Sequence, residues 1–294
     1  MQATQPLFAE RSWTSDDGLR LFARDYAAAD GPARCPVICI HGLTRNSADF
    51  DEVAPWIASQ GRRVLAVDVR GRGRSEYDPD SSHYTPSVYA ADMITLAERL
   101  GIARAVFIGT SMGGIITMTL ALKRSRLIAA AVLNDVGPFI SQNGLNRIAG
   151  YVGQGAALES WDDAAAYSQR INGYAFPDYT PDDWMKWARR TFTQDAGGKF
   201  VLQYDPGIAL AVRKGDIKTT SWIARLAFRR LARERPTLLV RGATSDLLEI
   251  EQAKRMQAIA PSMQYCEVPG VGHAPMLMEP QAQAALRRFL DEVA

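Results

Sequence analysis

The apolar and polar positions along the chain follow two different periods. Short apolar runs rich in Val, Ile, Leu and Ala predict strands that are covered on both faces. Longer segments with apolar residues three or four positions apart predict amphipathic helices. The predicted strands are residues 13–26 (two strands joined by a tight turn at Asp17-Gly18), 36–40, 63–68, 106–109, 129–136, 236–241 and 264–268. The predicted helices are residues 51–60, 84–100, 115–122, 250–260 and 280–293.

The alternation of strands and helices stops in the middle of the chain and resumes later. Before and after this break, strand and helix take turns, which predicts an α/β fold with a parallel sheet and helices on both faces. Residues 139–235 instead contain helical, aromatic-rich segments without a convincing run of strands. We therefore expect one α/β core, formed by residues 1–138 and 236–294, with residues 139–235 inserted as a helical cap.

One turn between a predicted strand and a predicted helix carries candidate chemistry. Gly109-Thr-Ser-Met-Gly113 fits the G-x-S-x-G pattern of a nucleophile elbow, which holds a serine at the apex of a sharp strand-to-helix turn. Glycines two positions before and after Ser111 avoid collisions at such a turn. The helix that follows points its free N–H groups at Ser111, where an oxyanion would form. A plain Gly/Ser turn is the simpler alternative, but the strand before and the helix after favour the elbow.

His273 and two aspartates are candidates to activate Ser111. A serine hydroxyl needs a base to take its proton, and the base needs an acid that orients it. His273 lies in the loop after the last predicted strand, and Asp246 follows the strand before it, so Ser111, Asp246 and His273 occur in the order expected after this elbow. Asp135, after the strand of residues 129–136, is a second candidate for the acid, or a cap at the entrance to the inserted segment. We favour Asp246, because its loop matches the commoner arrangement.

Composition narrows the classes of function. A net charge of +2 over 294 residues gives no electrostatic case for binding nucleic acid. No apolar run is long enough to span a bilayer, and the first residues do not resemble a signal peptide, so we expect a cytoplasmic protein. The three cysteines lack metal-type or redox-type spacing, and the Arg- and Gly-rich residues 68–75 lack the spacing of a phosphate-binding loop. We therefore expect neither a metal site nor a cofactor.

Several short motifs, spread over nearly the whole chain, resemble those of the α/β-hydrolase superfamily. They are His41-Gly42, residues 68–75, residues 109–114, Ser245-Asp246 and Gly272-His273. The resemblance implies a mostly parallel eight-stranded sheet with the second strand antiparallel, flanked by helices, and a helical cap inserted after the sixth strand. It also implies that the backbone N–H groups of Leu43 and Met112 form an oxyanion hole, while His41 is a structural residue of its loop.

The motifs predict a cofactor-independent serine hydrolase that cleaves a small, largely apolar carboxylic ester or lactone through an acyl-enzyme. The alternatives are a hydrolase of carbon–carbon bonds in a dienoate or diketone, and a ligand receptor that keeps the fold with little turnover. We expect a small-molecule substrate, no nucleic-acid or membrane partner, and a monomer or homodimer. Arg45, Arg190 and Arg213 are candidates to contact a substrate carboxylate, although solvation at the surface is the simpler role for each.

Overall fold

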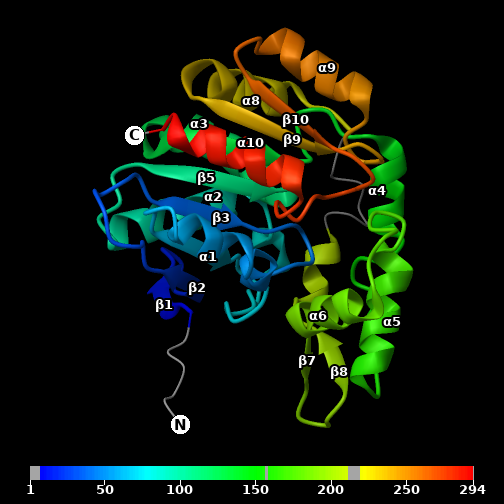
Figure 1. Ribbon diagram of the computed structural model, residues 1–294. Helices are drawn as coiled ribbons and strands as arrows, with labels where there is room; N and C mark the ends of the chain where they lie inside the picture. The colour runs from blue at the N-terminus through cyan, green and yellow to red at the C-terminus, as the bar shows by residue number, and fades with distance from the viewer. Residues whose placement is uncertain (1–6, 156–157, 211–218, 294) are drawn as a thin grey trace.

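The structure is a computed structural model that describes residues 7–155, 158–210 and 219–293. An eight-stranded sheet runs through its centre (Figure 1). Its strands are β1 (Ala9–Thr14), β2 (Arg20–Tyr26), β3 (Val37–Ile40), β4 (Val64–Asp68), β5 (Ala105–Thr110), β6 (Ile128–Asn134), β9 (Thr237–Gly242) and β10 (Gln264–Val268). They lie in the order β1-β2-β4-β3-β5-β6-β9-β10. β2 pairs antiparallel with both neighbours, and all other pairs from β4 to β10 are parallel, which confirms the predicted fold class.

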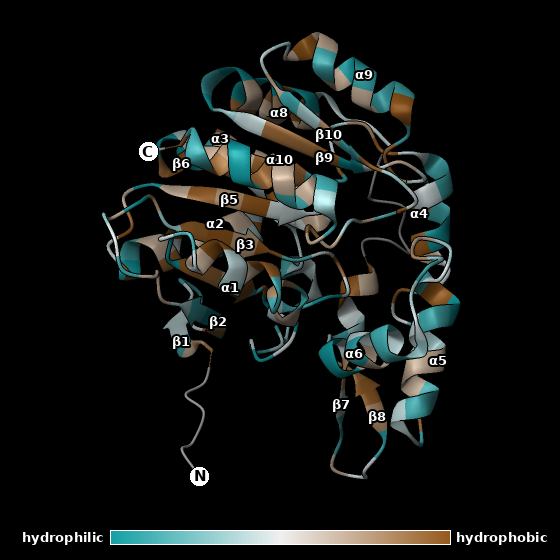
Figure 2. Ribbon diagram, viewed as in Figure 1, coloured by the Kyte–Doolittle hydropathy of each residue, from teal (hydrophilic) through white to brown (hydrophobic). Residues whose placement is uncertain are grey.

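Helices cover both faces of the sheet. α1 (Val53–Ala58) and α10 (Pro280–Asp291) pack on one face, and α2 (Pro86–Arg99), α3 (Met112–Arg124), α8 (Trp222–Glu234) and α9 (Ile250–Ile259) pack on the other. Alternate residues of β3 serve the two faces: Ile38 and Ile40 join the core under α2 and α3, and Val37 and Cys39 join the core under α1 and α10. Because both faces are covered, the strand is apolar throughout, and Figure 2 colours the central strands largely as hydrophobic.

The elements from α4 to β8, which follow β6 along the chain, form a separate group at one end of the sheet (Figure 1). It contains α4 (Gln142–Ala149), α5 (Trp161–Asn172), α6 (Pro181–Thr191) and the hairpin of β7 (Phe192–Gln194) and β8 (Phe200–Leu202). Short 3-10 helices complete the described elements: η1 (Ser47–Phe50), η2 (Ser81–His83), η3 (Ser125–Leu127) and η4 (Pro206–Ile208). In the described parts of the chain, no helix combines the length and the apolar character that crossing a bilayer requires.

The inserted segment differs from the prediction in two respects. The hairpin was not expected, because strands of three residues are too short to show a period of two. α8 does not stand with the other inserted helices. Its apolar residues Ala227, Phe228 and Leu231 join the main core, and the helix packs against α3. The end of the expected cap therefore lies on the sheet, and of its described elements α4, α5, α6 and the hairpin stand at the end of the sheet.

Candidate active site

Ser111 occupies the predicted strand-to-helix turn between β5 and α3. Its φ of 52° lies in the left-handed region, which is strained for a residue with a side chain. The turn is possible only with glycine on either side. A Cβ on Gly109 would collide with the backbone of Gly113, and a Cβ on Gly113 would collide with the carbonyl oxygen of Ile40. The hydroxyl is thus held at the end of β5, directly before the N-terminus of α3.

His273 connects Ser111 to a carboxylate. The His273 Nε2 lies 2.9 Å from Ser111 Oγ, and its Nδ1 lies 2.7 Å from Asp135 Oδ2. An ionised carboxylate only accepts hydrogen bonds, so Nδ1 carries the proton and Nε2 is free to accept the proton of the serine hydroxyl. This is the protonation that a general base needs before it activates a serine.

Asp135 is held by its surroundings as firmly as Ser111. It follows β6 with a φ of 57°, and its side chain is fully buried. The carboxylate accepts hydrogen bonds from the Gly242 N–H at 3.0 Å and the Ser245 hydroxyl at 2.6 Å, besides the one from His273. A buried charge needs such partners, because none of its hydration remains. Three donors therefore fix this carboxylate against the imidazole.

No hydrogen bond joins Asp246 to His273, whose Nδ1 binds Asp135 instead, and this corrects the preference for Asp246 as the orienting acid. Its carboxylate instead forms a two-pronged ion pair with Arg147 of α4, at 2.6 Å to Nε and 2.9 Å to Nη2. Burial disfavours its ionisation, but the Arg147 guanidinium outweighs this and lowers the pKa of Asp246 below the usual value. The side chain remains 27% exposed. The carboxylate that binds the imidazole belongs to Asp135, the second candidate. The loop after β9 turns Asp246 toward the inserted helices, where it meets Arg147.

The expected oxyanion donors flank Ser111. Leu43 and Met112 both line the cavities at Ser111, and no acceptor in the described residues is hydrogen-bonded to either backbone N–H. His41 holds the loop that carries Leu43. Its Nε2 accepts from the Val69 N–H at 3.1 Å, so its Nδ1 donates to the Gly42 carbonyl at 2.7 Å. Burial lowers the pKa of His41 to about 3, so the ring stays neutral and has a structural role in this loop.

Arg72 joins the two loops that carry these donors. Its Nε donates to the Leu43 carbonyl at 3.0 Å, and its Nη2 lies 3.5 Å from the Met112 Sδ. Its Nη1 donates to the Tyr89 hydroxyl at 2.8 Å. The side chain is fully buried, and within the described residues no carboxylate pairs with it. A buried guanidinium is therefore fixed next to both expected oxyanion residues.

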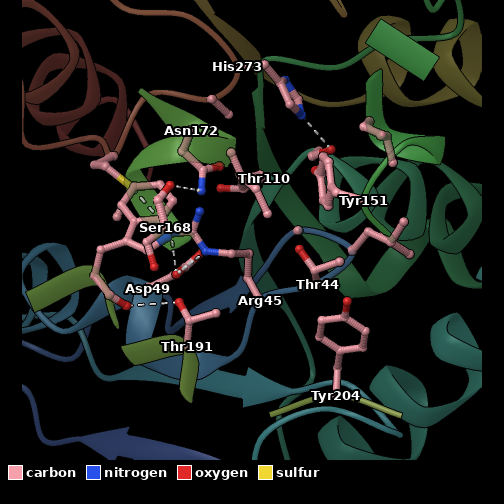
Figure 3. A pocket seen from close by; sticks show the side chains of 18 of the residues that line it. Thr44, Arg45, Asp49, Thr110, Tyr151, Ser168, Asn172, Thr191, Tyr204 and His273 are labelled. Atoms are coloured by element: carbon pink, nitrogen blue, oxygen red, sulfur yellow. Dashed lines mark hydrogen bonds and ion pairs between the residues drawn. The ribbon is translucent and has the colours of Figure 1, made fainter. Parts of the chain in front are cut away.

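A polar pocket opens in front of Ser111 and His273. Figure 3 shows the Arg45 guanidinium inside this pocket, ion-paired with Asp49. Arg190, the second candidate for a substrate carboxylate, lies outside the lining of this pocket and pairs with Glu52. Arg213, the third candidate, lies outside the described residues.

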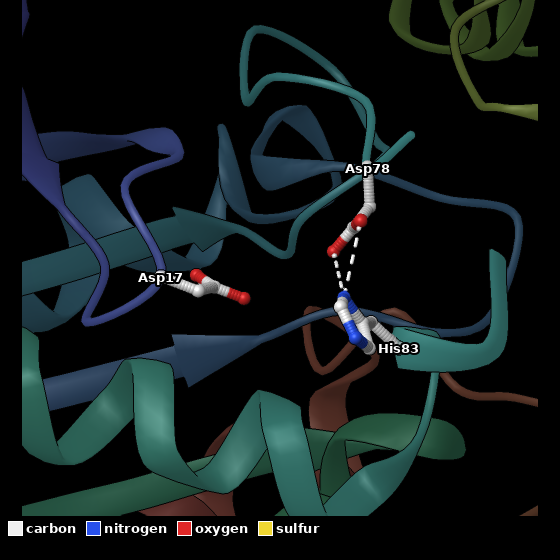
Figure 4. A group of neighbouring side chains, drawn as sticks. All are labelled: Asp17, Asp78 and His83. Atoms are coloured by element: carbon white, nitrogen blue, oxygen red, sulfur yellow. Dashed lines mark hydrogen bonds and ion pairs between the residues drawn. The ribbon is translucent and has the colours of Figure 1, made fainter. Parts of the chain in front are cut away.

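One group of side chains elsewhere has donor atoms close enough to hold a metal ion. The ligand atoms of Asp17, Asp78 and His83 lie within 4.8 Å of one another (Figure 4), the only such group within the described ranges. The Arg70 guanidinium already occupies this position, because its Nη1 lies 2.7 Å from Asp17 Oδ2 and 2.7 Å from Asp78 Oδ2. Asp92 binds the other side of Arg70. A side chain thus takes the place that a metal ion would occupy, and its ion pairs secure the loop of residues 68–75.

Sequence reasoning did not find several of the supporting residues. Ser245 was noted only as the neighbour of Asp246, although its hydroxyl binds Asp135. Arg147 and Arg72 received no role. The one signal in the sequence was the pair Asn134-Asp135 at a strand end, where Asn134 donates to the Thr110 hydroxyl at 3.0 Å and to the Pro275 carbonyl at 2.7 Å. These bonds join the loops that carry Ser111 and His273.

Known proteins are similar to this chain in sequence and in fold. The chain is 42% identical to a solved structure of an α/β hydrolase from Novosphingobium aromaticivorans, with a TM-score of 0.91 over 99% of this chain and 100% of that one. It is 37% identical over 257 residues to a 3-hydroxybutyrate-oligomer hydrolase from Cupriavidus necator, covering 86% of this chain and 87% of the relative. It is 26% identical over 258 residues to an sn-1-specific diacylglycerol lipase from Mus musculus, covering 87% and 80%.

A sequence model of the alpha/beta hydrolase family matches residues 37–286, from the start of β3 into α10. The match spans the six parallel strands from β3 to β10, the turn at Ser111 and the loop of His273. The two relatives described above are named as a hydrolase and a lipase. With the eight-stranded sheet, the match makes this chain a member of the α/β-hydrolase family.

Proposed function

We propose that this chain hydrolyses carboxylic esters, including lactones, with Ser111 as the nucleophile. The observation that carries the proposal is the line of hydrogen bonds from Ser111 through His273 to Asp135, beside two unpaired backbone N–H groups. A serine, a correctly protonated imidazole, a buried carboxylate and oxyanion donors are together the machinery of acyl transfer. The chemistry requires only these groups and water.

In the first half of the reaction, Ser111 Oγ attacks the ester carbonyl carbon while its proton moves to His273 Nε2. The carbonyl oxygen becomes an oxyanion and accepts hydrogen bonds from the Leu43 and Met112 N–H groups. Each such donor contributes about 3 kcal/mol of transition-state stabilisation. The bond from carbon to the alcohol oxygen then breaks, the alcohol leaves with the proton from His273, and the acyl group remains on Ser111.

In the second half, water replaces the alcohol. His273 takes one proton from water, and the hydroxide oxygen attacks the acyl carbon through a second oxyanion. The bond to Ser111 Oγ breaks, the serine regains its proton from His273, and the carboxylic acid departs. Asp135 stays ionised throughout and stabilises the imidazolium that forms in each half.

Two relatives support an ester as the bond that is cleaved. The names of the Cupriavidus and mouse proteins give 3-hydroxybutyrate oligomers and diacylglycerol as what they act on, and both are esters. The open cavities on both sides of Ser111 also suit a substrate with two arms, as an ester has.

The test is turnover of p-nitrophenyl butyrate by the chain and by Ser111→Ala. We expect many turnovers per molecule in the first and a loss to near the uncatalysed rate in the second. Labelling with a fluorophosphonate, followed by mass spectrometry of the modified peptide, identifies the nucleophile independently. A single stoichiometric burst without turnover, or unchanged turnover in Ser111→Ala, would refute the proposal.

A further inference from the structure

Two cavities of different character meet at Ser111. The narrower one, of about 90 Å³, has a mixed lining, in which Thr44, Arg45, Asn172 and His273 lie beside apolar side chains such as Trp187 and Phe192. Because it is the more polar of the two, it is called the polar cavity below. The wider one, of about 470 Å³, is lined mainly by apolar side chains. These include Met112, Ile115, Met118, Val136, Leu145 and Leu247. The cavities share Leu43, Ser111 and Ile148, so a substrate bound at Ser111 has one arm in each.

The position of His273 decides which arm lies in which cavity. The leaving alcohol must receive its proton from His273, and the incoming water must lose one to it. Of the two sets of lining residues, only that of the polar cavity contains His273. The alcohol part of the ester therefore lies in the polar cavity, and the acyl part lies in the apolar one.

Arg45 places a guanidinium, ion-paired with Asp49, in the lining of the polar cavity. A Cβ built on Gly42 would lie 3.6 Å from Arg45 Cγ and 3.7 Å from Ser111 Cβ, so both side chains begin beside the same glycine. The guanidinium carbon lies 3.7 Å from the ring centroid of Trp187, which fixes its plane. Its Nε and Nη2 both bind one oxygen of Asp49, at 2.8 Å and 2.7 Å.

One edge of this guanidinium is available to a ligand. Within the described residues, no acceptor is hydrogen-bonded to Arg45 Nη1, and Nη2 has only a 3.7 Å contact with the Met276 sulfur besides Asp49. Arginine presents paired N–H groups that match a carboxylate. Asp49 already supplies one negative charge here, so a monoanion is easier to accommodate than a dianionic phosphate. Arg147 differs, because Asp246 takes two of its nitrogens with both carboxylate oxygens.

We propose that Arg45 binds a carboxylate on the alcohol part of the ester, so the substrate is a hydroxy-acid ester cleaved at its carboxylate end. The products are the free hydroxy acid and the shortened carboxylic acid, with one water consumed. This inference rests on the ester hydrolysis proposed above and adds the direction of binding and the charged group of the substrate. Arg45 is then a specificity-determining residue and takes no part in the bond changes.

The experiment compares two forms of one substrate. The linear dimer of 3-hydroxybutyrate carries the free carboxylate, and its methyl ester differs only by neutralising that group. We expect the chain to cleave the internal ester of the free acid with a kcat/KM about 10-fold to 100-fold above that of the methyl ester, the usual effect of a hydrogen bond to a charged group. Because the ratio compares two substrates on one protein, it is insensitive to the fraction of folded enzyme.

The variants remove the charge without leaving a lone buried partner. Replacing both members of the pair, Arg45→Gln with Asp49→Asn, should lower the acid-to-methyl-ester ratio to about one, and Arg45→Lys should retain part of it. Arg190→Gln is the matched control, because Arg190 also pairs with an acid between core and inserted segment but does not line this cavity. Its ratio should equal that of the unmodified chain.

Three results would overturn the inference. Equal cleavage of the two dimer forms by the unmodified chain, or a preference that survives the loss of Arg45, would show that no carboxylate is bound there. Cleavage of p-nitrophenyl butyrate without cleavage of either dimer would also overturn it, while leaving the proposed ester hydrolysis intact. If p-nitrophenyl butyrate is not turned over in a Ser111-dependent way, the proposed function itself fails.

Discussion

Two loops at the same edge of the sheet each present an aspartate, and the difference between them decides which one serves His273. Asp135, after β6, is fully buried and accepts hydrogen bonds from a backbone N–H, a hydroxyl and the imidazole. Asp246, after β9, is partly exposed and is paired with Arg147. The two aspartates follow neighbouring strands of the sheet, so their positions in the chain alone do not distinguish them.

What distinguishes the two loops is the charge that each carboxylate faces. Arg147 already satisfies Asp246 with a permanent cation, so that carboxylate gains little from a histidine. Asp135 has only neutral donors besides His273, so its negative charge is available to stabilise the imidazolium that forms during the reaction. The remainder of the loop after β9 still contributes, because Gly242 and Ser245 come from it and hold Asp135.

The largest effect is expected from Asp135→Asn. The amide nitrogen would donate to Nδ1, which places the imidazole proton on Nε2 and prevents it from accepting the serine proton. We expect kcat for p-nitrophenyl butyrate to fall by about 1,000-fold to 10,000-fold, as when the acid of such a triad is neutralised. Circular dichroism and urea unfolding should show that the variant is folded. A loss below tenfold in a folded variant would remove Asp135 from the mechanism.

Ser245→Ala tests the support of Asp135 and should have an intermediate effect. It removes one of the donors that hold the carboxylate and leaves the charge in place. We expect kcat to fall by about tenfold, because Asp135 loses a hydrogen bond that holds it against His273. KM should change little, because Ser245 acts on Asp135 and not on the substrate. Ser245→Thr, which keeps the hydroxyl, should recover most of the activity. If alanine and threonine behave alike, the hydroxyl has no part in positioning Asp135.

Asp246→Asn should have a small effect on turnover. The variant loses an ion pair between the core and α4 but leaves Ser111, His273 and Asp135 unchanged. We expect kcat/KM to change by about threefold at most, since partly exposed ion pairs contribute little. Arg147→Gln, which removes the same pair from its other side, should match it. A loss comparable with that of Asp135→Asn would restore Asp246 as the acid.

The elements of the core could be read from the sequence because each one repeats a strong pattern. The apolar run of β3 indicates a strand that is covered on both faces, and the glycines around Ser111 indicate a tight turn. His273 was identified for the same reason: it follows the last strand of a parallel sheet. The preference for Asp246 over Asp135 was wrong, since both follow adjacent strands and no local pattern separates them. The choice depends on Arg147, a contact between residues 99 positions apart that no local pattern encodes.

The inserted segment was less predictable for a related reason. Its hairpin strands have three residues each, and α8 looks like any other amphipathic helix until its partner α3 is known. The oxyanion donors were expected from the family resemblance. The contacts of Arg72 with both of these residues were not expected, because an arginine in a Gly-rich loop usually faces solvent or binds a phosphate. Within the described residues, Arg70 binds three carboxylates and Arg72 binds none, a difference that only the structure shows.

The smallest expected effect concerns stability and separates the two aspartates by pH. Arg147 lowers the folded-state pKa of Asp246, so its ion pair stabilises the fold above the unfolded-state pKa of about 3.9 and loses this effect as the pH falls through the folded-state value. At pH 7, Asp246→Asn should therefore reduce the free energy of unfolding by about 1 kcal/mol. The difference between the two proteins should shrink as the pH is lowered below 4.

Urea unfolding of both proteins at a series of pH values, from 7 down to the lowest pH with a cooperative transition, measures this difference. Asp291→Asn is the control, because Asp291 lies 3.5 Å from Arg34 with 57% of its side chain exposed, and its removal should have almost no effect. A penalty for Asp246→Asn that grows on acidification would mean that the carboxylate is not held by Arg147. Asp246 would then be free to approach His273, and the contrast between the two loops would no longer hold.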